Sequence, residues 1–252
     1  MIIGNFVILS IIIPTLNEEF YLPKLLTALS KQTFRDFEVI VVDGKSQDKT
    51  VFEAAKFIDR VPSLKIIEGV RGISRQRNLG ARESQGEYFL FFDADVVPAT
   101  NFLEVLMAEI KKRRIDCGMV FPRPQSPNLG TRIAATLGSL FLFGALWPFY
   151  KNTIGADFWL RREVFEEVGG FDEELTFAED NDLLRRILKK GYSYRVLYKP
   201  KIYMSLRRFE RDGYFKYILK SVISMVLIAI FGIKRTQKII SFEFGQHAKP
   251  KG

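Results

Sequence analysis

The sequence has 252 residues, of which 47% are hydrophobic and 27% charged, and its net charge is +9. The length suits one large domain, or a domain with a small appendage, and the composition is that of a globular chain and not of a disordered one. The single cysteine, Cys117, excludes an intramolecular disulfide framework, so a reducing compartment is permitted. Residues 1–10 are apolar but lack the basic segment and cleavage site of a signal peptide, and we interpret them as leading into a first strand.

The positive charge is concentrated at the C-terminus. Residues 183–252 hold 17 basic and 3 acidic side chains, whereas acidic side chains outnumber basic ones before them. We expect this segment to meet an anionic surface, although a solvated basic face is the alternative. Its long aliphatic stretches favour an anionic membrane over nucleic acid, for which the sequence has no reader motif.

The first hundred residues alternate short apolar runs with segments of helical period. The runs predict strands at 6–14, 37–43, 63–68 and 88–93, and the segments between them predict helices at 22–29 and 51–58. This pattern indicates an α/β fold with a Rossmann-like, doubly wound, mainly parallel sheet and helices on both faces. Polar and acidic residues follow three of the strands, at 14–19, 43–48 and 93–95, so three loops should meet at one edge of the sheet.

Two apolar stretches in the second half of the chain predict amphipathic or apolar helices. The first, at 133–150, carries no charge, and the second, at 221–233, lies within the basic C-terminal region. We expect their apolar faces to enter lipid at the membrane surface; packing on the domain and a spanning hairpin are the alternatives. The side chains expected to contact lipid headgroups are Arg207, Arg208, Arg211, Lys216, Lys234, Arg235 and Lys238.

Two carboxylates, Asp93 and Asp95, directly follow the predicted strand at 88–93. Side chains two positions apart in an extended segment point the same way, and hard oxygen ligands suit Mg²⁺ or Mn²⁺, which bridge nucleotide phosphates. No glycine-rich phosphate loop follows the first strand, and no Walker pattern is present, which disfavours dinucleotide-binding and P-loop enzymes. A metal held by these carboxylates would neutralise the phosphates instead.

Five motifs occur in a recognisable order: S-I-I-I-P-T-L-N-E, V-V-D-G-K-S-Q-D-K-T, R-Q-R-N-L-G, D-A-D, and G-G-F-D-E followed by A-E-D-N-D-L. With them the chain resembles the family 2 glycosyltransferases over about residues 8–200, which implies a GT-A fold and inverting transfer. The implied glycosyltransferase domain is 1–205, with a nucleotide-binding half at 1–100 and an acceptor half at 101–205. A basic, apolar, membrane-associating segment would follow at 206–252.

The resemblance also implies a nucleotide-sugar pocket at the strand ends. Its residues would be Pro14, Thr15, Asn17, Glu18, Asp43, Ser46, Asp48, Arg77, Asn78, Asp93 and Ala94. Asp43 would accept a hydrogen bond from the base, Asp93 would face the ribose, and Asp95 together with Asp93 would hold Mn²⁺ or Mg²⁺. Without the resemblance, ordinary turn chemistry explains Asp43 and Asp48, and a solvated helix face explains Arg77 and Asn78.

The acidic cluster at residues 179–182 is the expected source of the catalytic base. Inverting transfer needs a group that takes the proton of the acceptor hydroxyl, and a carboxylate suits this task. In the family pattern this base is supplied by the Glu-Asp pair, so Asp180 is the first choice and Glu179 the second. The alternative is that these acids only stabilise the start of a helix.

These features predict an inverting glycosyltransferase that moves a sugar from a UDP- or GDP-linked donor to a hydroxyl or lipid phosphate. The acceptor is an unknown glycan or lipid, and the protein is expected at the cytoplasmic face of the membrane, bound peripherally. A nucleotidyltransferase is the first competing hypothesis, although such enzymes usually carry a glycine- and arginine-rich loop after the first strand. A catalytically inactive nucleotide-binding anchor or regulator is the second, and a glycoside hydrolase, which would need no nucleotide, is the third.

Overall fold

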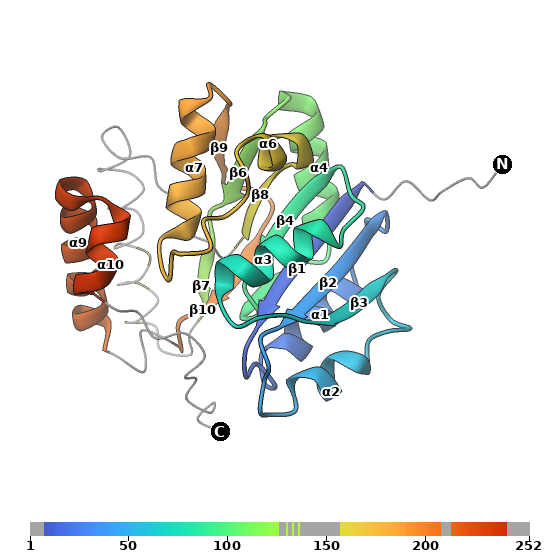
Figure 1. The fold of residues 1–252 in the computed structure, drawn as a ribbon. Helices are drawn as coiled ribbons and strands as arrows, with labels where there is room; N and C mark the ends of the chain where they lie inside the picture. The colour runs from blue at the N-terminus through green and yellow to red at the C-terminus, as the bar shows by residue number, and fades with distance from the viewer. Residues whose placement is uncertain are drawn as a thin grey trace.

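A seven-stranded sheet in the order β3-β2-β1-β4-β8-β6-β9 lies at the centre of the structure (Figure 1). The computed structural model describes residues 8–125, 157–207 and 213–240, together with Gly130, Ile133 and Thr136. Strands β1 (Leu9–Thr15), β2 (Phe37–Asp43), β3 (Leu64–Glu68) and β4 (Tyr88–Phe92) pair in parallel. Strand β8 (Asp157–Arg161) is antiparallel to β4 and to β6 (Cys117–Val120), and β9 (Tyr194–Leu197) is parallel to β6. The predicted mainly parallel sheet is thus confirmed.

The central strands are buried on both faces, which explains their nearly continuous apolar sequences. In β1, Leu9, Ile11 and Ile13 belong to one core cluster and Ile12 belongs to the other, because alternate side chains of a strand point to opposite faces. The predicted first strand, 6–14, is observed at Leu9–Thr15; residues 6 and 7 lie outside the described part of the chain.

Helices cover both faces of the sheet, as the sequence predicts. Helices α1 (Leu22–Ser30) and α4 (Phe102–Arg113) pack into one core cluster. On the opposite face lie α3 (Ile73–Arg82), α6 (Arg162–Glu167) and α7 (Glu179–Lys189). Phenylalanine side chains are prominent in this second cluster, where Phe89, Phe91 and Phe165 have ring centroids 5.3–6.1 Å apart.

The second predicted helix, at 51–58, is shorter than expected. Helix α2 spans only Thr50–Ala55, and Val51 and Ile58 are 44% and 52% exposed. Because the helix ends at Ala55, the chain turns and places Phe57 and Val61 in the core instead. Within α2 itself, Ala54 is buried.

A small second sheet brings the C-terminal region to the D-A-D loop. Strand β10 (Ile202–Ser205) lies between β5 (Val96–Pro98) and β7 (Arg123–Gln125). The backbone N–H of Ser205 donates to the carbonyl of Asp95 at 3.1 Å. Residues that follow β10 therefore reach the same edge of the main sheet as the end of β4.

Two helices end the described chain, α9 (Tyr214–Phe231) and α10 (Ile233–Ile239), joined at Gly232 with a φ of 76°. They lie as a pair on the side of the molecule where α7 lies (Figure 1). Ile228 and Ile233 pack there against Leu175 and Phe177. Within the described residues no helix is long and apolar enough to cross a membrane. The apolar stretch 133–150 lies outside the described residues, apart from Ile133 and Thr136.

Candidate active site

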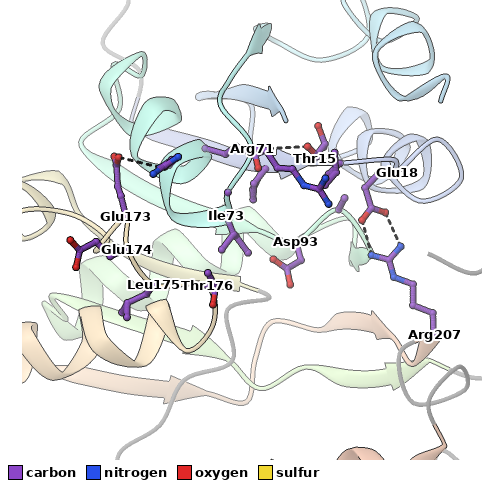
Figure 2. A pocket seen from close by; sticks show the side chains of 16 residues that line it. Thr15, Glu18, Arg71, Ile73, Asp93, Glu173, Glu174, Leu175, Thr176 and Arg207 are labelled. Carbon is purple, nitrogen blue, oxygen red and sulfur yellow. Dashed lines mark hydrogen bonds and ion pairs between the residues drawn. The ribbon is translucent and has the colours of Figure 1, made fainter. Parts of the chain in front are cut away.

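A cavity of about 470 Å³ opens at the carboxyl ends of β1 and β4, within the range of small-molecule sites (Figure 2). Three segments form most of its wall: the loop after β1, the chain from Arg71 to Gln76 at the start of α3, and the loop Glu173–Thr176 before α7. Asp93, Ala94 and Arg207 complete it. Of the predicted nucleotide-binding residues, those that line the cavity are Pro14, Thr15, Glu18, Asp93 and Ala94.

Several other predicted residues hold the loops after β1 and β2 together. Asp43 accepts hydrogen bonds from the hydroxyls of Thr15 (3.1 Å) and Ser46 (2.6 Å) and from the backbone N–H of Ser46 (2.8 Å). Asn17, at a φ of 58°, donates its N–H to Ser46 Oγ at 2.8 Å. Asp48 accepts the backbone N–H of Glu19 at 3.1 Å. The polar loop residues are thus fixed in position before any ligand arrives.

Gln76 connects the two strands beneath the cavity, a role that the sequence does not reveal. Its side-chain amide donates to the carbonyls of Thr15 at 2.8 Å and of Val42 at 2.7 Å. It belongs to the R-Q-R-N motif, so the motif pointed to the correct helix face without identifying this contact. Two exposed arginines line the same wall: Arg71, which lies outside the motifs, and Arg75, the first residue of R-Q-R-N-L-G, for which the sequence predicts no role.

Arg207 occupies the position next to Asp95, the expected metal ligand. Its Nε lies 2.8 Å from Asp95 Oδ2. Its two terminal nitrogens donate to the carboxylate of Glu18, each at 2.8 Å (Figure 2). The guanidinium also lies 4.2 Å from the ring centroid of Tyr21. Burial alone would lower the pKa of Arg207. The hydrogen bond to Glu18 and the negative charges of Asp95 and Glu18 outweigh this effect and raise the pKa above its usual value, so the side chain stays cationic.

The expectation that Arg207 contacts lipid headgroups is therefore wrong, whereas Lys234 has acidic partners but a side chain that is 61% exposed. Arg207 is buried between two carboxylates because β10 carries it to the D-A-D loop. Lys234 lies within 2.6 Å of Glu174 and 3.0 Å of Asp172, in the loop before α7. Arg208 and Arg211 lie outside the described residues.

Arg77 joins the D-A-D loop to the start of α7. Its two terminal nitrogens donate to Asp93 at 3.0 Å and to Glu179 at 2.7 Å, and its side chain is only 1% exposed. Asn78 binds both backbone groups of Phe171, accepting its N–H and donating to its carbonyl, each at 2.9 Å. Neither residue lines the cavity, and both position elements around it.

Asp180 and Glu179 are buried in the first turn of α7 and do not line the cavity; Glu179 contacts Arg77. Ala178, which precedes them, has a φ of 54°, a strained conformation for a non-glycine residue of the kind that clusters at functional sites. Burial, and then the negative charge of Glu179, raise the pKa of Asp180 to about 8, although Arg77 and the N–H of Asn181 oppose the shift. A carboxyl group with a pKa near neutrality suits a general base.

Another carboxyl group of this edge, that of Asp157, is completely buried. Asp157 begins β8 opposite Phe92, and its Oδ2 accepts the N–H of Val120 at 3.1 Å. Its Oδ1 has no hydrogen-bond partner within the described structure. Burial raises the pKa of Asp157 well above its usual range, and the nearby charge of Asp93 adds to the shift.

The oxygen donors at this edge suit a divalent metal only when a donor substrate adds ligands of its own. Among the described residues, no group of three His, Cys, Asp or Glu side chains lies close enough to hold a metal. Asp93 and Asp95 offer hard oxygens, and Mg²⁺ commonly takes one or two carboxylates together with substrate phosphates and water. Both carboxylates have arginine partners in this structure, Arg77 and Arg207.

Residues 10–169 match the model of the family "Glycosyl transferase family 2". Glycosyltransferase AglE of Haloferax volcanii is 30% identical over 190 residues, 73% of this chain and 62% of AglE. A Methanococcus voltae enzyme named dolichyl N-acetyl-α-D-glucosaminyl phosphate 3-β-D-2,3-diacetamido-2,3-dideoxy-β-D-glucuronosyltransferase is 26% identical over 235 residues, 86% of this chain and 71% of that one. The chain therefore belongs to glycosyl transferase family 2, as its motifs predict.

Two solved structures have the same fold. The mannosyltransferase PcManGT from Pyrobaculum calidifontis, in complex with GDP-Man and Mn²⁺, gives a TM-score of 0.68 at 20% identity over 93% of this chain and 65% of its own. Residues 1–349 of TarS from Staphylococcus aureus, in complex with UDP-GlcNAc, give 0.63 at 23% identity over 88% of this chain and 66% of that one. The GT-A fold is thereby confirmed. The chain spans 62% of the length of AglE and smaller shares of some other relatives, such as 35% of TarS.

Proposed function

We propose that this chain is an inverting glycosyltransferase that moves a sugar from a nucleoside-diphosphate sugar to an acceptor hydroxyl or lipid phosphate. The observation that carries the proposal is the buried chain of contacts from Asp93 through Arg77 to Glu179, next to Asp180. It joins a cavity at the strand ends to a carboxyl group whose pKa suits a base. The relatives' names and the UDP-GlcNAc and GDP-Man complexes of the structural neighbours support a nucleotide-sugar donor.

In this proposal the donor nucleotide occupies the cavity between the loop after β1 and the start of α3. Asp43 does not itself line the cavity, but it contacts Thr15, which does, and in this proposal it accepts a hydrogen bond from the base. Exposed Arg71 and Arg75 lie on the same wall and contribute positive charge toward the diphosphate. UDP and GDP are the leading nucleotides.

Asp95 and Asp93 would hold Mn²⁺ or Mg²⁺ together with the phosphates of the donor. When bound, the ion would stabilise the negative charge that develops on the leaving nucleoside diphosphate. Arg207 adds a fixed cation at the same edge, and a preorganised positive group of this kind stabilises developing charge without reorganisation.

Asp180 takes the proton of the attacking acceptor hydroxyl. Arg77 bonds both Glu179, the neighbour of Asp180, and Asp93. It therefore fixes the position of the base relative to the carboxylate that would face the bound donor. A positioned general base accelerates such a step by about 10²- to 10⁴-fold.

We also propose that the protein works as a peripheral protein at the cytoplasmic face of a membrane, on a lipid-linked or glycan acceptor. The relative from Methanococcus voltae is named for a dolichyl phosphate substrate, which supports a lipid-linked acceptor here. The strongly basic segment after residue 183 supports an anionic membrane surface, and residues 206–252 would form the associating region.

The test is release of nucleoside diphosphate from a panel of UDP- and GDP-sugars, with Mn²⁺ and a detergent-solubilised sugar-linked polyprenyl phosphate, in which a sugar hydroxyl is the acceptor. We expect Asp180→Asn to lower the rate by about 10²- to 10⁴-fold while leaving donor binding intact. Asp182→Asn is the matched control, because Asp182 lies in the same helical turn but pairs with Arg186 at 2.8 Å. Full activity in Asp180→Asn would contradict the assignment of the base. Release of pyrophosphate from a nucleoside triphosphate and a sugar phosphate would favour a nucleotidyltransferase.

A further inference from the structure

One face of α9 exposes a continuous apolar stripe. Its members lie three or four positions apart, which places them on one side of the helix. Their exposed fractions run from 38% to 65%, and they are Leu219, Val222, Ile223, Val226 and Ile230. On the opposite side Ser224 and Ile228 are buried against the rest of the molecule. A helix of this kind has one face on the protein and one face without a described partner.

The charges around this stripe have a single sign. Residues 213–240 contain five lysine and arginine residues and no aspartate or glutamate. Lys216 and Lys220 belong to α9, and Arg235 and Lys238 are exposed on α10. An apolar stripe flanked by cations matches the boundary between headgroups and acyl chains of an anionic membrane. A second copy of the chain fits less well, because it would bring the same positive charges together.

The other side of the two helices holds the loop that forms one wall of the cavity. Lys234 pairs with Glu174 at 2.6 Å, and Gln237 accepts the backbone N–H of Thr176 at 3.1 Å while donating to the carbonyl of Glu174 at 3.2 Å. Leu175 and Phe177 pack on Ile228 and Ile233. This loop lines the cavity and leads through Ala178 directly into Glu179 and Asp180.

We propose that the exposed face of α9 and α10 binds an anionic lipid bilayer, and that this contact orders the active-site loop 172–177. Lipid and loop lie on opposite sides of the same two helices, so immobilising the helices restricts the loop through Lys234 and Gln237. The lipid contact is inferred from the exposed side chains of α9 and α10 alone, whereas its effect on catalysis rests on the proposed glycosyltransferase function. The lipid can shift the loop from a mobile to an ordered state only if the protein with the ordered loop binds lipid more tightly. The coupling is therefore measurable as increased protection of the loop from hydrogen exchange when lipid is bound.

The lipid contact is tested by co-sedimentation with vesicles of phosphatidylcholine, alone or mixed with phosphatidylglycerol. We expect the protein to bind the mixed vesicles and the double variant Val226→Ser, Ile230→Ser to bind them at least about tenfold more weakly, because two aliphatic side chains that would enter the lipid are lost. The control is Val51→Ser, Ile58→Ser, whose side chains are similarly exposed in and just after α2. Equal binding by the stripe variant and the protein would overturn the proposal. A stripe variant that loses self-association but keeps vesicle binding would assign the surface to a second copy instead.

The coupling is tested by hydrogen exchange of residues 172–177 with and without mixed vesicles, which needs no substrate. We expect vesicles to slow exchange in this loop of the unmodified protein, and to leave it unchanged in Lys234→Ala, Gln237→Ala, which keeps the stripe and still sediments with vesicles. Unchanged exchange in the unmodified protein, with vesicles bound, would overturn the coupling. If nucleoside diphosphate release were absent while both lipid results held, only the proposed catalytic function would fail.

Discussion

The guanidinium Nε of Arg207 lies 2.8 Å from Oδ2 of Asp95, although the two residues are far apart in the sequence. The same guanidinium holds the carboxylate of Glu18 with two further contacts of 2.8 Å. The carboxylate that the D-A-D motif offers to a metal is therefore already neutralised by a side chain of the protein. Metal binding at Asp95 must compete with this ion pair, so the metal and the donor diphosphate should bind together.

Replacing Arg207 should strengthen binding of Mn²⁺ to the donor-free protein. In Arg207→Met, Glu18 and Asp95 lose their shared cation, and we expect the affinity for Mn²⁺ to rise by about tenfold or more, because a positive charge within contact distance is removed. Titration calorimetry without nucleotide measures it. Arg195→Met, an exposed site on β9, is the control. An unchanged affinity would show that Asp95 does not bind the ion.

Removing the buried charge of Arg77 should destabilise the fold. Arg77→Met leaves Glu179 and Asp93 without their partner in a nearly buried setting, and breaking a buried pair in this way costs about 3–5 kcal/mol. Arg75→Met, at a half-exposed side chain with a 3.9 Å contact to Glu173, should change stability by about 0.5 kcal/mol or less. Urea unfolding of the two variants makes the comparison, and equal loss of stability would contradict the structural role of Arg77.

The pH dependence of the reaction should report the carboxyl group of Asp180. Its raised pKa, about 8, means that the basic form appears only as the pH rises through this value, so kcat/KM for the donor should increase over that range. Glu179→Gln removes the negative neighbour that contributes to the shift, so the increase should move to lower pH. Asp182→Asn should leave the profile in place. A profile that is flat from about pH 6 to 9 would exclude Asp180 as the base.

Asp157 should make stability depend on pH. Its pKa is raised in the folded protein, mainly by burial, so folding retains a proton that the unfolded chain releases above about pH 4. The protein should lose stability relative to Asp157→Asn as the pH rises from that value. Asparagine keeps an acceptor for the N–H of Val120. Denaturant unfolding at several pH values tests this, and a constant difference between the two proteins would contradict it.

The strands of the first half and the edge that they share were predictable because the signals are local. Buried parallel strands such as β2 read as unbroken apolar runs, and the residues that end them, including Asp43 and Asp93, necessarily meet at one edge of the sheet. The helical pattern at 51–58 was misleading, because spacing alone does not show where a short helix ends.

The roles of the arginines were not predictable from sequence. Arg207 belongs to a run of basic residues, and nothing in its neighbours distinguishes it; only the pairing of β10 with β5 carries it to Asp95, and its contact with Glu18 spans 189 positions. Arg77 was expected in the nucleotide pocket, and the structure gives it two internal carboxylate partners. The sequence shows that these arginines are present, whereas contacts between distant parts of the chain determine which carboxylates they pair with.

Nucleotide-sugar binding at this cavity is the central claim, and a thermal-shift panel of UDP-, GDP- and dTDP-sugars with and without Mn²⁺ tests it most directly. One nucleotide sugar should raise the melting temperature in a Mn²⁺-dependent manner, since a ligand at 100 times its Kd adds about 2.7 kcal/mol of stability. Asp95→Ala should abolish the shift, and the surface variant Asp182→Asn should retain it. No shift with any nucleotide sugar, in a protein that unfolds cooperatively, would contradict a donor site in this cavity.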